Sequence, residues 1–268
     1  MANHAVAVLE SALRERKLDR TLTTALPPLE RTDPSAVAGT GTAALDAVLH
    51  GGLPRGQLSE IAGAPSTGRT ALLLQMMAAA TRRGEIAALI DTFDRLDVPS
   101  AIAAGIDLDR LLWVRGDAIA QTDAGHAGAV RDLRDRVLDR AVKALNLVLQ
   151  AGGFGLVAID LADVPAIALK RLPFTTWLRV QRTIEGSDTA CVLVVPEPLA
   201  RSAGGLTCTL AARTSWAGTP DRSRRLDRLD ITTRIVSPRR RVEGEVAIAA
   251  CANDKRASEK QDAPYNDL

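Results

Sequence analysis

From residue 58 onward, short apolar runs alternate with longer segments in which apolar residues recur at every third or fourth position. The short runs have the length of buried strands, and the longer segments have the period of amphipathic helices. Strands are predicted at Leu58–Ala62, Ile86–Asp91, Leu111–Val114, Leu156–Asp160 and Cys191–Val195. Helices are predicted at Thr70–Ala80, Pro99–Ala104 and Thr175–Ile184, and a longer one through Val130, Leu133, Val137, Ala141, Leu145 and Val148 up to Gly152-Gly153. The alternation predicts an α/β fold with a mostly parallel sheet flanked by helices.

Beyond Ala203 the pattern changes to strict alternation of apolar and polar positions. One strand would place Leu206, Cys208, Leu210 and Ala212 on the same face. Two further segments have the pattern of a hairpin around a polar connection, namely Ile231–Ser237 and Val246–Ala252 around Pro238–Gly244. We therefore expect an antiparallel C-terminal extension of the sheet.

The two ends of the chain differ from this core. Residues 1–38 combine a helical pattern at Ala5–Leu13 with a proline-containing stretch, and we interpret them as an N-terminal helical arm and linker. The arm either packs on its own core or docks on a neighbouring subunit or partner. Residues 39–252 would form the core, and the polar residues 253–268 predict a disordered tail.

Composition and charge narrow the functional classes only a little. A formal net charge of +2 favours neither a nucleic-acid nor a membrane partner. The three cysteines are widely spaced in apolar runs, which indicates reduced structural thiols: Cys191, Cys208 and Cys251. Residues 1–20 are charged throughout and no apolar run approaches about 20 residues, so we expect a cytoplasmic protein.

A candidate phosphate-binding loop follows the first predicted strand. Its pattern is G-x-x-x-x-G-K-[ST] with arginine in the lysine position, and the expected nucleotide contacts are Gly63, Ala64, Pro65, Ser66, Thr67, Gly68, Arg69 and Thr70. A guanidinium binds phosphate as a planar fork and not as a compact charge, so hydrolysis should suffer more than binding. Alternatively, Arg69 points outward and the loop holds no ligand.

Asp160 ends a predicted buried strand downstream of this loop. A carboxylate in that place holds Mg²⁺ through water in phosphate-loop folds, although taken alone it would more often cap a turn. We therefore expect Thr70 and Asp160 to form the metal site. The scattered histidines suggest no other metal site, and no pairing of a nucleophile with a base is visible.

An ordered set of motifs over residues 40–250 resembles the RecA-type recombinases. The set comprises Gly39-Thr40-Gly41, Leu45-Asp46, Gly51–Gly56, the phosphate loop, Leu89–Asp91, Ala104–Asp107 and Ile159-Asp160. Within that superfamily the chain most resembles the ImuA proteins of bacterial mutagenesis cassettes, in Leu111–Arg115, Ala151–Gly155 and Trp177–Arg182. The resemblance implies a RecA-like core that binds ATP and Mg²⁺, and a place in the DNA-damage (SOS) response. It also implies an ImuB-type Y-family polymerase homologue and the host RecA as partners, with self-association through the N-terminal arm.

Three departures from the RecA pattern bear on catalysis. Phe93 stands where RecA has its catalytic glutamate, and Glu197 stands where RecA has a nucleotide-sensing glutamine. The segment Leu199–Gly204 is too short to match RecA's long DNA-binding loop. We therefore expect no catalytic residues and no or weak ATPase activity. The predicted function is that of a nucleoid-associated accessory protein, supporting error-prone translesion synthesis through protein contacts.

Two other functions stay open at this stage. One is an active, DNA-stimulated ATPase in which Arg69 and a nearby carboxylate such as Asp94 suffice, and the other is an interaction-only cell-division inhibitor similar to SulA. Direct DNA binding is open as well, because arginines cluster near residue 225 and on the predicted hairpin connection: Arg222, Arg224, Arg225, Arg228 and Arg239–Arg241. Aspartates are interleaved with them, so the clusters equally fit a solvated face.

Overall fold

The computed structural model describes residues 36–117, 127–200, 205–218, 224–237 and 242–251. The chain divides into two units between Asp33 and Pro34, and every described residue belongs to the second unit. Nearly all of the predicted arm and the whole of the predicted tail therefore lie outside the described residues.

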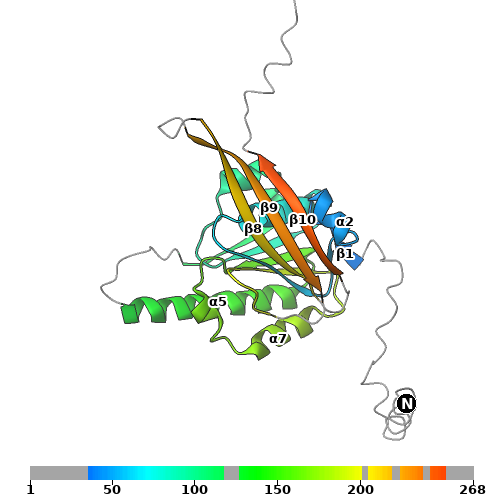
Figure 1. Cartoon of the computed structure of the whole chain (residues 1–268). Coiled ribbons are helices and arrows are strands. Elements are labelled where there is room, and N and C mark those ends of the chain that lie inside the picture. The colour runs from blue at the N-terminus through cyan, green and yellow to red at the C-terminus, as the bar shows by residue number, and fades with distance from the viewer. Residues whose placement is uncertain (1–35, 118–126, 201–204, 219–223, 238–241, 252–268) are drawn as a thin grey trace, which may run out of the picture. The chain divides into compact units, whose positions relative to one another are not determined.

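Eight strands of the described part form one sheet, in the order β10-β9-β8-β3-β7-β6-β4-β5 (Figure 1). The bounds are β3 Leu58–Gly63, β4 Ala87–Asp91, β5 Leu111–Arg115, β6 Leu156–Asp160, β7 Ala190–Val195, β8 Thr207–Ala217, β9 Arg225–Ser237 and β10 Val242–Cys251. From β8 to β5 each strand is parallel to its neighbour, whereas β9 and β10 are antiparallel. The predicted α/β class, with its mostly parallel sheet and antiparallel C-terminal end, is confirmed.

β8 differs from the predicted antiparallel extension in its orientation relative to the core strands. Its alternation is as expected, since Cys208 and Leu210 are buried, but it pairs in parallel with β3 and is antiparallel only to β9. The connection from β7 to β8 passes beside β3, where the backbone N–H groups of Leu199 and Ala200 donate to Oε1 of the buried Glu60. The antiparallel part of the sheet therefore begins at β9.

Helices cover both faces of the sheet because neighbouring residues of a strand point to opposite sides. Ala87 and Leu89 of β4 pack in one apolar cluster with α3, whereas Ala88 and Ile90 pack in a second cluster with α5 and α7. Figure 1 shows α5 and α7 side by side along the sheet, and the two helices are in contact. The helix bounds are α2 Ala43–Val48, α3 Arg69–Arg82, α4 Val98–Ala103, η2 Leu108–Arg110, α5 Ala127–Ala151, α6 Ala166–Leu169 and α7 Phe174–Ile184.

The long helix α5 follows its predicted apolar stripe over most of its length. Val137, Ala141, Leu145 and Val148 are buried, whereas Leu133 is 37% exposed. Gly152 and Gly153 follow the helix with φ angles of 67° and 80°, a conformation that ends a helix and that glycine adopts readily.

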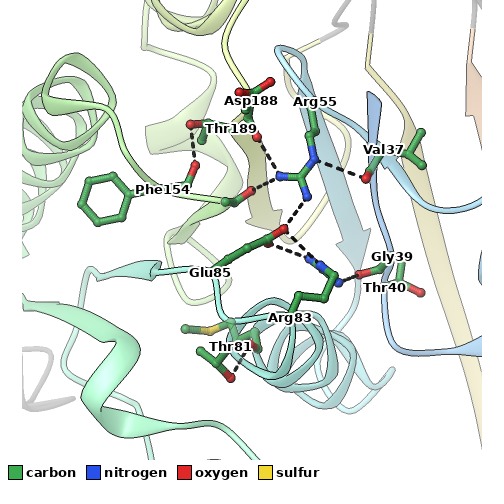
Figure 2. A network of polar contacts seen from close by, with 12 residues as sticks. Val37, Gly39, Thr40, Arg55, Thr81, Arg83, Glu85, Phe154, Asp188 and Thr189 are labelled. Atoms are coloured by element: carbon green, nitrogen blue, oxygen red, sulfur yellow. Dashed lines mark hydrogen bonds and ion pairs between the residues drawn. The ribbon is translucent and has the colours of Figure 1, made fainter. Parts of the chain in front are cut away.

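A polar network ties together the amino-terminal ends of four parallel strands (Figure 2). Arg55, which precedes β3, donates through Nη1 to the carbonyls of Gly155 and Asp188 at 3.2 and 2.7 Å, and pairs with Glu85 at 2.5 Å. Arg83 also pairs with Glu85, at 2.9 Å, and its Nη1 donates to the carbonyl of Gly39. Gly155, Asp188 and Glu85 precede β6, β7 and β4. The cluster therefore joins the strand ends opposite to those beside the phosphate loop.

Residues 37–38 already belong to the folded core. Val37–Ala38 form the short strand β1, which pairs antiparallel with β2 at Leu53–Pro54, and both residues of β1 are buried. The carbonyl of Val37 also accepts a hydrogen bond from Arg55 Nε. Residues 37 and 38, which the predicted linker includes, are thus hydrogen-bonded to other described residues of the core.

Candidate functional site

The predicted phosphate loop joins the end of β3 to the start of α3. β3 ends at Gly63 and α3 begins at Arg69, so the strand, loop and helix have the order that the motif requires. Ser66 and Gly68 have positive φ angles of 63° and 90°. The Thr67 hydroxyl donates to the carbonyl of Ala64 at 2.8 Å and closes the turn.

Both glycines of the motif stand where other parts of the chain come very close. A Cβ atom on Gly63 would lie 2.6 Å from Thr67 Oγ1 and 2.8 Å from the carbonyl oxygen of Leu210 in β8. A Cβ atom on Gly68 would lie 2.5 Å from Ile231 Cδ1 in β9. Strands β8 and β9 therefore pack directly against the loop, and the glycines are required by this contact.

A cavity of about 590 Å³ opens beside the loop at the carboxyl ends of the parallel strands. Pro65, Ser66, Arg69 and Thr70 line it from the loop and α3, and Asp160 lines it from β6. The lining also includes the charged residues Asp91, Arg95, Asp97 and Asp163. The structure thus brings five of the predicted site residues to one cavity, while Gly63, Ala64, Thr67 and Gly68 shape the turn behind it.

Arg69, the residue in the lysine position, is turned inward. The residue is only 7% exposed, and its Nη1 atom donates to the carbonyl oxygens of Val195 at 3.1 Å and Ala162 at 3.4 Å. These acceptors lie at the end of β7 and just after β6. Burial lowers the pKa of Arg69, and the charges of Asp160 and Asp163 oppose that shift. The alternative in which Arg69 points outward is wrong.

Asp160 is the last residue of β6, as the sequence predicted. Its Oδ1 accepts a hydrogen bond from the backbone N–H of Ala162 at 2.9 Å. Burial raises the pKa of Asp160 to about 6, and the charges of Asp91 and Asp163 act in the same direction. A partly buried carboxylate whose pKa is raised in this way is typical of functional sites.

Asp91 is a wall residue that the sequence reasoning did not assign to the site. It ends β4 and pairs in register with Asp160 across the two adjacent strands. Its two oxygens accept hydrogen bonds from the backbone N–H groups of Arg95 and Leu96, each at 2.8 Å, and from Trp113 Nε1 at 3.1 Å. The signal that singled out Asp160, a carboxylate at the end of a buried strand, applies equally to Asp91.

The positions that depart from RecA lie away from the cavity. Phe93 is buried in the apolar cluster that contains α5 and α7, and it does not line the cavity. Asp94 forms a two-point ion pair with Arg115, at 2.8 and 2.7 Å, and does not line it either. Glu197 pairs with Lys170 at 2.9 Å on the surface.

The arginine clusters are described only in part. Arg224 stacks over the Trp216 ring at 4.8 Å, and Arg228 pairs with Asp230 at 2.5 Å. Arg222 and Arg239–Arg241 lie outside the described residues. Of the predicted structural thiols, Cys191 and Cys208 are buried, and burial raises the pKa of each to about 12.

The described residues contain neither a ready-made metal site nor a membrane-spanning helix. No group of three or more His, Cys, Asp or Glu side chains there is placed to hold a metal ion by itself. Within the same ranges, no helix has the length and apolar character needed to cross a bilayer.

Comparison with known proteins agrees with this phosphate-loop architecture. The RecA N-terminal domain model matches residues 15–148, which is half of the chain. The chain belongs to the RecA N-terminal domain family. This RecA-family chain is 38% identical over 128 residues to Protein RecA of Clavibacter michiganensis, and 35% identical over 158 residues to Protein RecA of Acidothermus cellulolyticus. The matches cover 47% and 59% of the chain, but only 30% and 39% of these relatives.

Proposed function

We propose that this chain binds a nucleoside triphosphate, ATP in the first instance, in the cavity beside Gly63–Thr70 and turns it over weakly or not at all. The observation that carries the proposal is the position of Arg69. The loop keeps its architecture and its basic residue faces inward, but that residue is bound to the carbonyls of Val195 and Ala162.

Support for binding comes from the loop itself. The cavity is lined by Ser66 of the loop and by Arg69 and Thr70 of the first turn of α3. The N–H groups at the start of a helix have no partner within the helix, which favours an anionic ligand there. The cavity is large enough for a small-molecule ligand, since such pockets measure about 300–1,000 Å³. Family membership supports the same class of ligand.

Support for weak turnover comes from the groups that would have to act on the terminal phosphate and on water. A guanidinium tied to two carbonyls is poorly placed to follow a transferring phosphoryl group, and positioning supplies most of the rate enhancement in such reactions. Phe93 offers no carboxylate, and both oxygens of Asp91 already accept hydrogen bonds. Asp94, the example of a nearby carboxylate in the active-ATPase alternative, is held by Arg115 and does not line the cavity.

The cellular role that we propose is that of an accessory protein in the DNA-damage (SOS) response, supporting error-prone translesion synthesis. It rests on the resemblance of Leu111–Arg115, Ala151–Gly155 and Trp177–Arg182 to ImuA. The proposed partners are an ImuB-type polymerase homologue and the host RecA, with DNA as a further ligand and self-association through residues 1–38. Such a protein would act at the nucleoid, and bound nucleotide would stabilise its fold or interface.

Two measurements on the full chain test the biochemical part. Thermal unfolding with and without ATP measures binding, and we expect ATP to raise the melting temperature. ATP turnover with and without single-stranded DNA measures catalysis, and we expect the wild type to equal an Asp160→Ala control. No thermal shift would contradict nucleotide binding, and turnover well above the control would favour the active-ATPase alternative.

The cellular part needs a separate experiment. Affinity capture from DNA-damaged cells should recover an ImuB-type polymerase homologue or RecA, and deletion of residues 1–38 should change the sedimentation of the purified chain. Arg69→Ala serves as a matched variant, because it alters the cavity without touching the arm. Unchanged sedimentation after the deletion would contradict self-association through the arm.

A further inference from the structure

The charge of Arg69 has a fixed place between two strand ends. Its Nη1 atom donates to the carbonyls of Val195, at the end of β7, and Ala162, two residues after the end of β6. The residue is 7% exposed, so the guanidinium cannot swing into solvent without losing both hydrogen bonds. A guanidinium stays protonated under all ordinary conditions, and the site therefore contains a permanent cation.

Arg69 also borders the cavity beside the phosphate loop. Arg69 lines it together with Ser66 and Thr70, and within the described part of the chain only Nη1 has a protein acceptor. The remaining N–H groups are therefore free to donate to an anionic ligand. Arginine forms such bonds to phosphate oxygens readily, because its planar fork presents several donors at once.

Asp160 and Asp163 are the carboxylates whose charges act on Arg69, and all three residues line the same cavity. Asp163 also pairs with Arg95 at 3.4 Å, whereas Asp160 accepts a single backbone N–H, that of Ala162. Of the other wall carboxylates, Asp97 accepts the N–H of Ser100 and Asp91 accepts two backbone N–H groups. Asp160 would otherwise be the acidic ligand of a metal ion, with Thr70 as the hydroxyl ligand.

We infer that the Arg69 guanidinium takes the place of the divalent cation, so that this site binds the phosphates of a nucleoside triphosphate without Mg²⁺. The inference rests on the proposed nucleotide binding and adds to it the charge that neutralises the phosphates. A divalent cation beside Asp160 would lie close to a second, immovable positive charge in a partly buried site, where repulsion is weakly screened. A lysine ammonium on its flexible stem could move within the cavity, whereas Arg69 is held at its wall by two carbonyls.

Binding of a fluorescent N-methylanthraniloyl ATP analogue to the full chain tests this inference. The Kd is measured by fluorescence anisotropy in excess Mg²⁺ and again in EDTA. We expect the two values to agree within about twofold. Wild-type binding that weakens about tenfold or more in EDTA would overturn the inference and leave nucleotide binding intact. Absence of binding in both conditions would overturn the proposed function and the inference together.

Variants of Arg69 sharpen the test. Arg69→Lys should make binding Mg²⁺-dependent, with a Kd at least about tenfold lower in Mg²⁺ than in EDTA. Arg69→Gln keeps an N–H donor for the two carbonyls but removes the charge, and it should bind weakly in EDTA and recover in Mg²⁺. Arg110→Gln is the matched control, since Arg110 does not line the cavity and pairs with Asp107 at 3.3 Å in a half-exposed ion pair. Its response to Mg²⁺ should equal that of the wild type, and a Mg²⁺ response of Arg69→Lys no larger than the control's would overturn the inference. Thermal unfolding confirms that each variant folds.

Discussion

Nη1 of Arg69 lies 3.1 Å from the carbonyl oxygen of Val195, so the first residue of α3 is bound to the carboxyl end of β7. The same atom reaches the carbonyl of Ala162 beyond β6. A side chain in the position of a ligand-binding lysine thus also joins α3 to two adjacent strands. These two hydrogen bonds hold the side chain in its inward position.

Arg69→Ala should lower the free energy of unfolding by about 1–3 kcal/mol, because two buried carbonyls lose their charged donor. Urea denaturation at neutral pH measures the change. Arg95→Ala is the control, since its ion pair with Asp163 joins two side chains that are each about half exposed and should contribute under about 1 kcal/mol. Equal effects of the two substitutions would show that the contacts of Arg69 contribute little.

Asp160 should make the protein less stable as the pH rises. Its pKa is raised from 3.8 to about 6 in the folded chain, so folding disfavours the charged form. Stability from this group is complete below pH 3.8, falls between pH 3.8 and about 6, and stays low above that range. Asp160→Asn should therefore raise the free energy of unfolding at pH 7.5 by about 2–3 kcal/mol and change it little at pH 4.

The N-cap carboxylate of α4 provides the opposite control. The Asp97 side chain accepts a hydrogen bond from the Ser100 N–H, and its interactions with Ser100 hold its pKa below the ordinary value. Asp97→Asn should therefore be neutral or destabilising at pH 7.5. A stabilisation of both variants at that pH would contradict the assigned origin of the Asp160 effect.

Much of the fold could be predicted from periodicity, because each inner strand is a short apolar run with a clear end. Leu156–Asp160 was predicted with its observed bounds, and α5 was found from its stripe of Val137, Ala141, Leu145 and Val148. Strand neighbours could not be predicted in the same way. That β8 lies beside β3 depends on contacts distant in sequence, such as those between Glu60 and the Leu199–Ala200 backbone.

The residues of the candidate site could be predicted from the motif, but their contacts could not. The spacing of Gly63–Thr70 and the strand-end position of Asp160 identified the residues that meet at the cavity. Local sequence carries no information on the acceptors of Arg69, which lie 93 and 126 residues away along the chain. The same limit applies to Phe93, whose burial in the α5–α7 cluster depends on the packing of both helices.

At the amino-terminal ends of the parallel strands, Arg55 should contribute more to stability than Arg83, although both residues pair with Glu85. Arg55 also donates to carbonyls before β6 and β7, and its side chain is 12% exposed against 33% for Arg83. Arg55→Met should lower the free energy of unfolding by about 2–4 kcal/mol and Arg83→Met by about 1 kcal/mol, measured by urea denaturation. The prediction fails if the order is reversed.

Gly68→Ala should destabilise the chain more than Gly84→Ala does. The two glycines have similar φ angles of 90° and 83°, so both substitutions carry the same backbone strain of about 1–3 kcal/mol. Only at Gly68 would the new Cβ meet a neighbour, 2.5 Å from Ile231 Cδ1, whereas nothing lies within 4 Å at Gly84. The clash should add about 1–3 kcal/mol, measured by chemical denaturation.

Ile231→Val tests whether that extra cost comes from the contact between β9 and the phosphate loop. The substitution removes the Cδ1 atom that the Gly68→Ala methyl group would meet, at a cost of about 0.5–1.5 kcal/mol by itself. In the double variant the two effects should be less than additive, with an interaction free energy of about 0.5–3 kcal/mol. Simple additivity would mean that backbone strain alone accounts for the destabilisation by Gly68→Ala. It would also mean that β9 does not shape the loop.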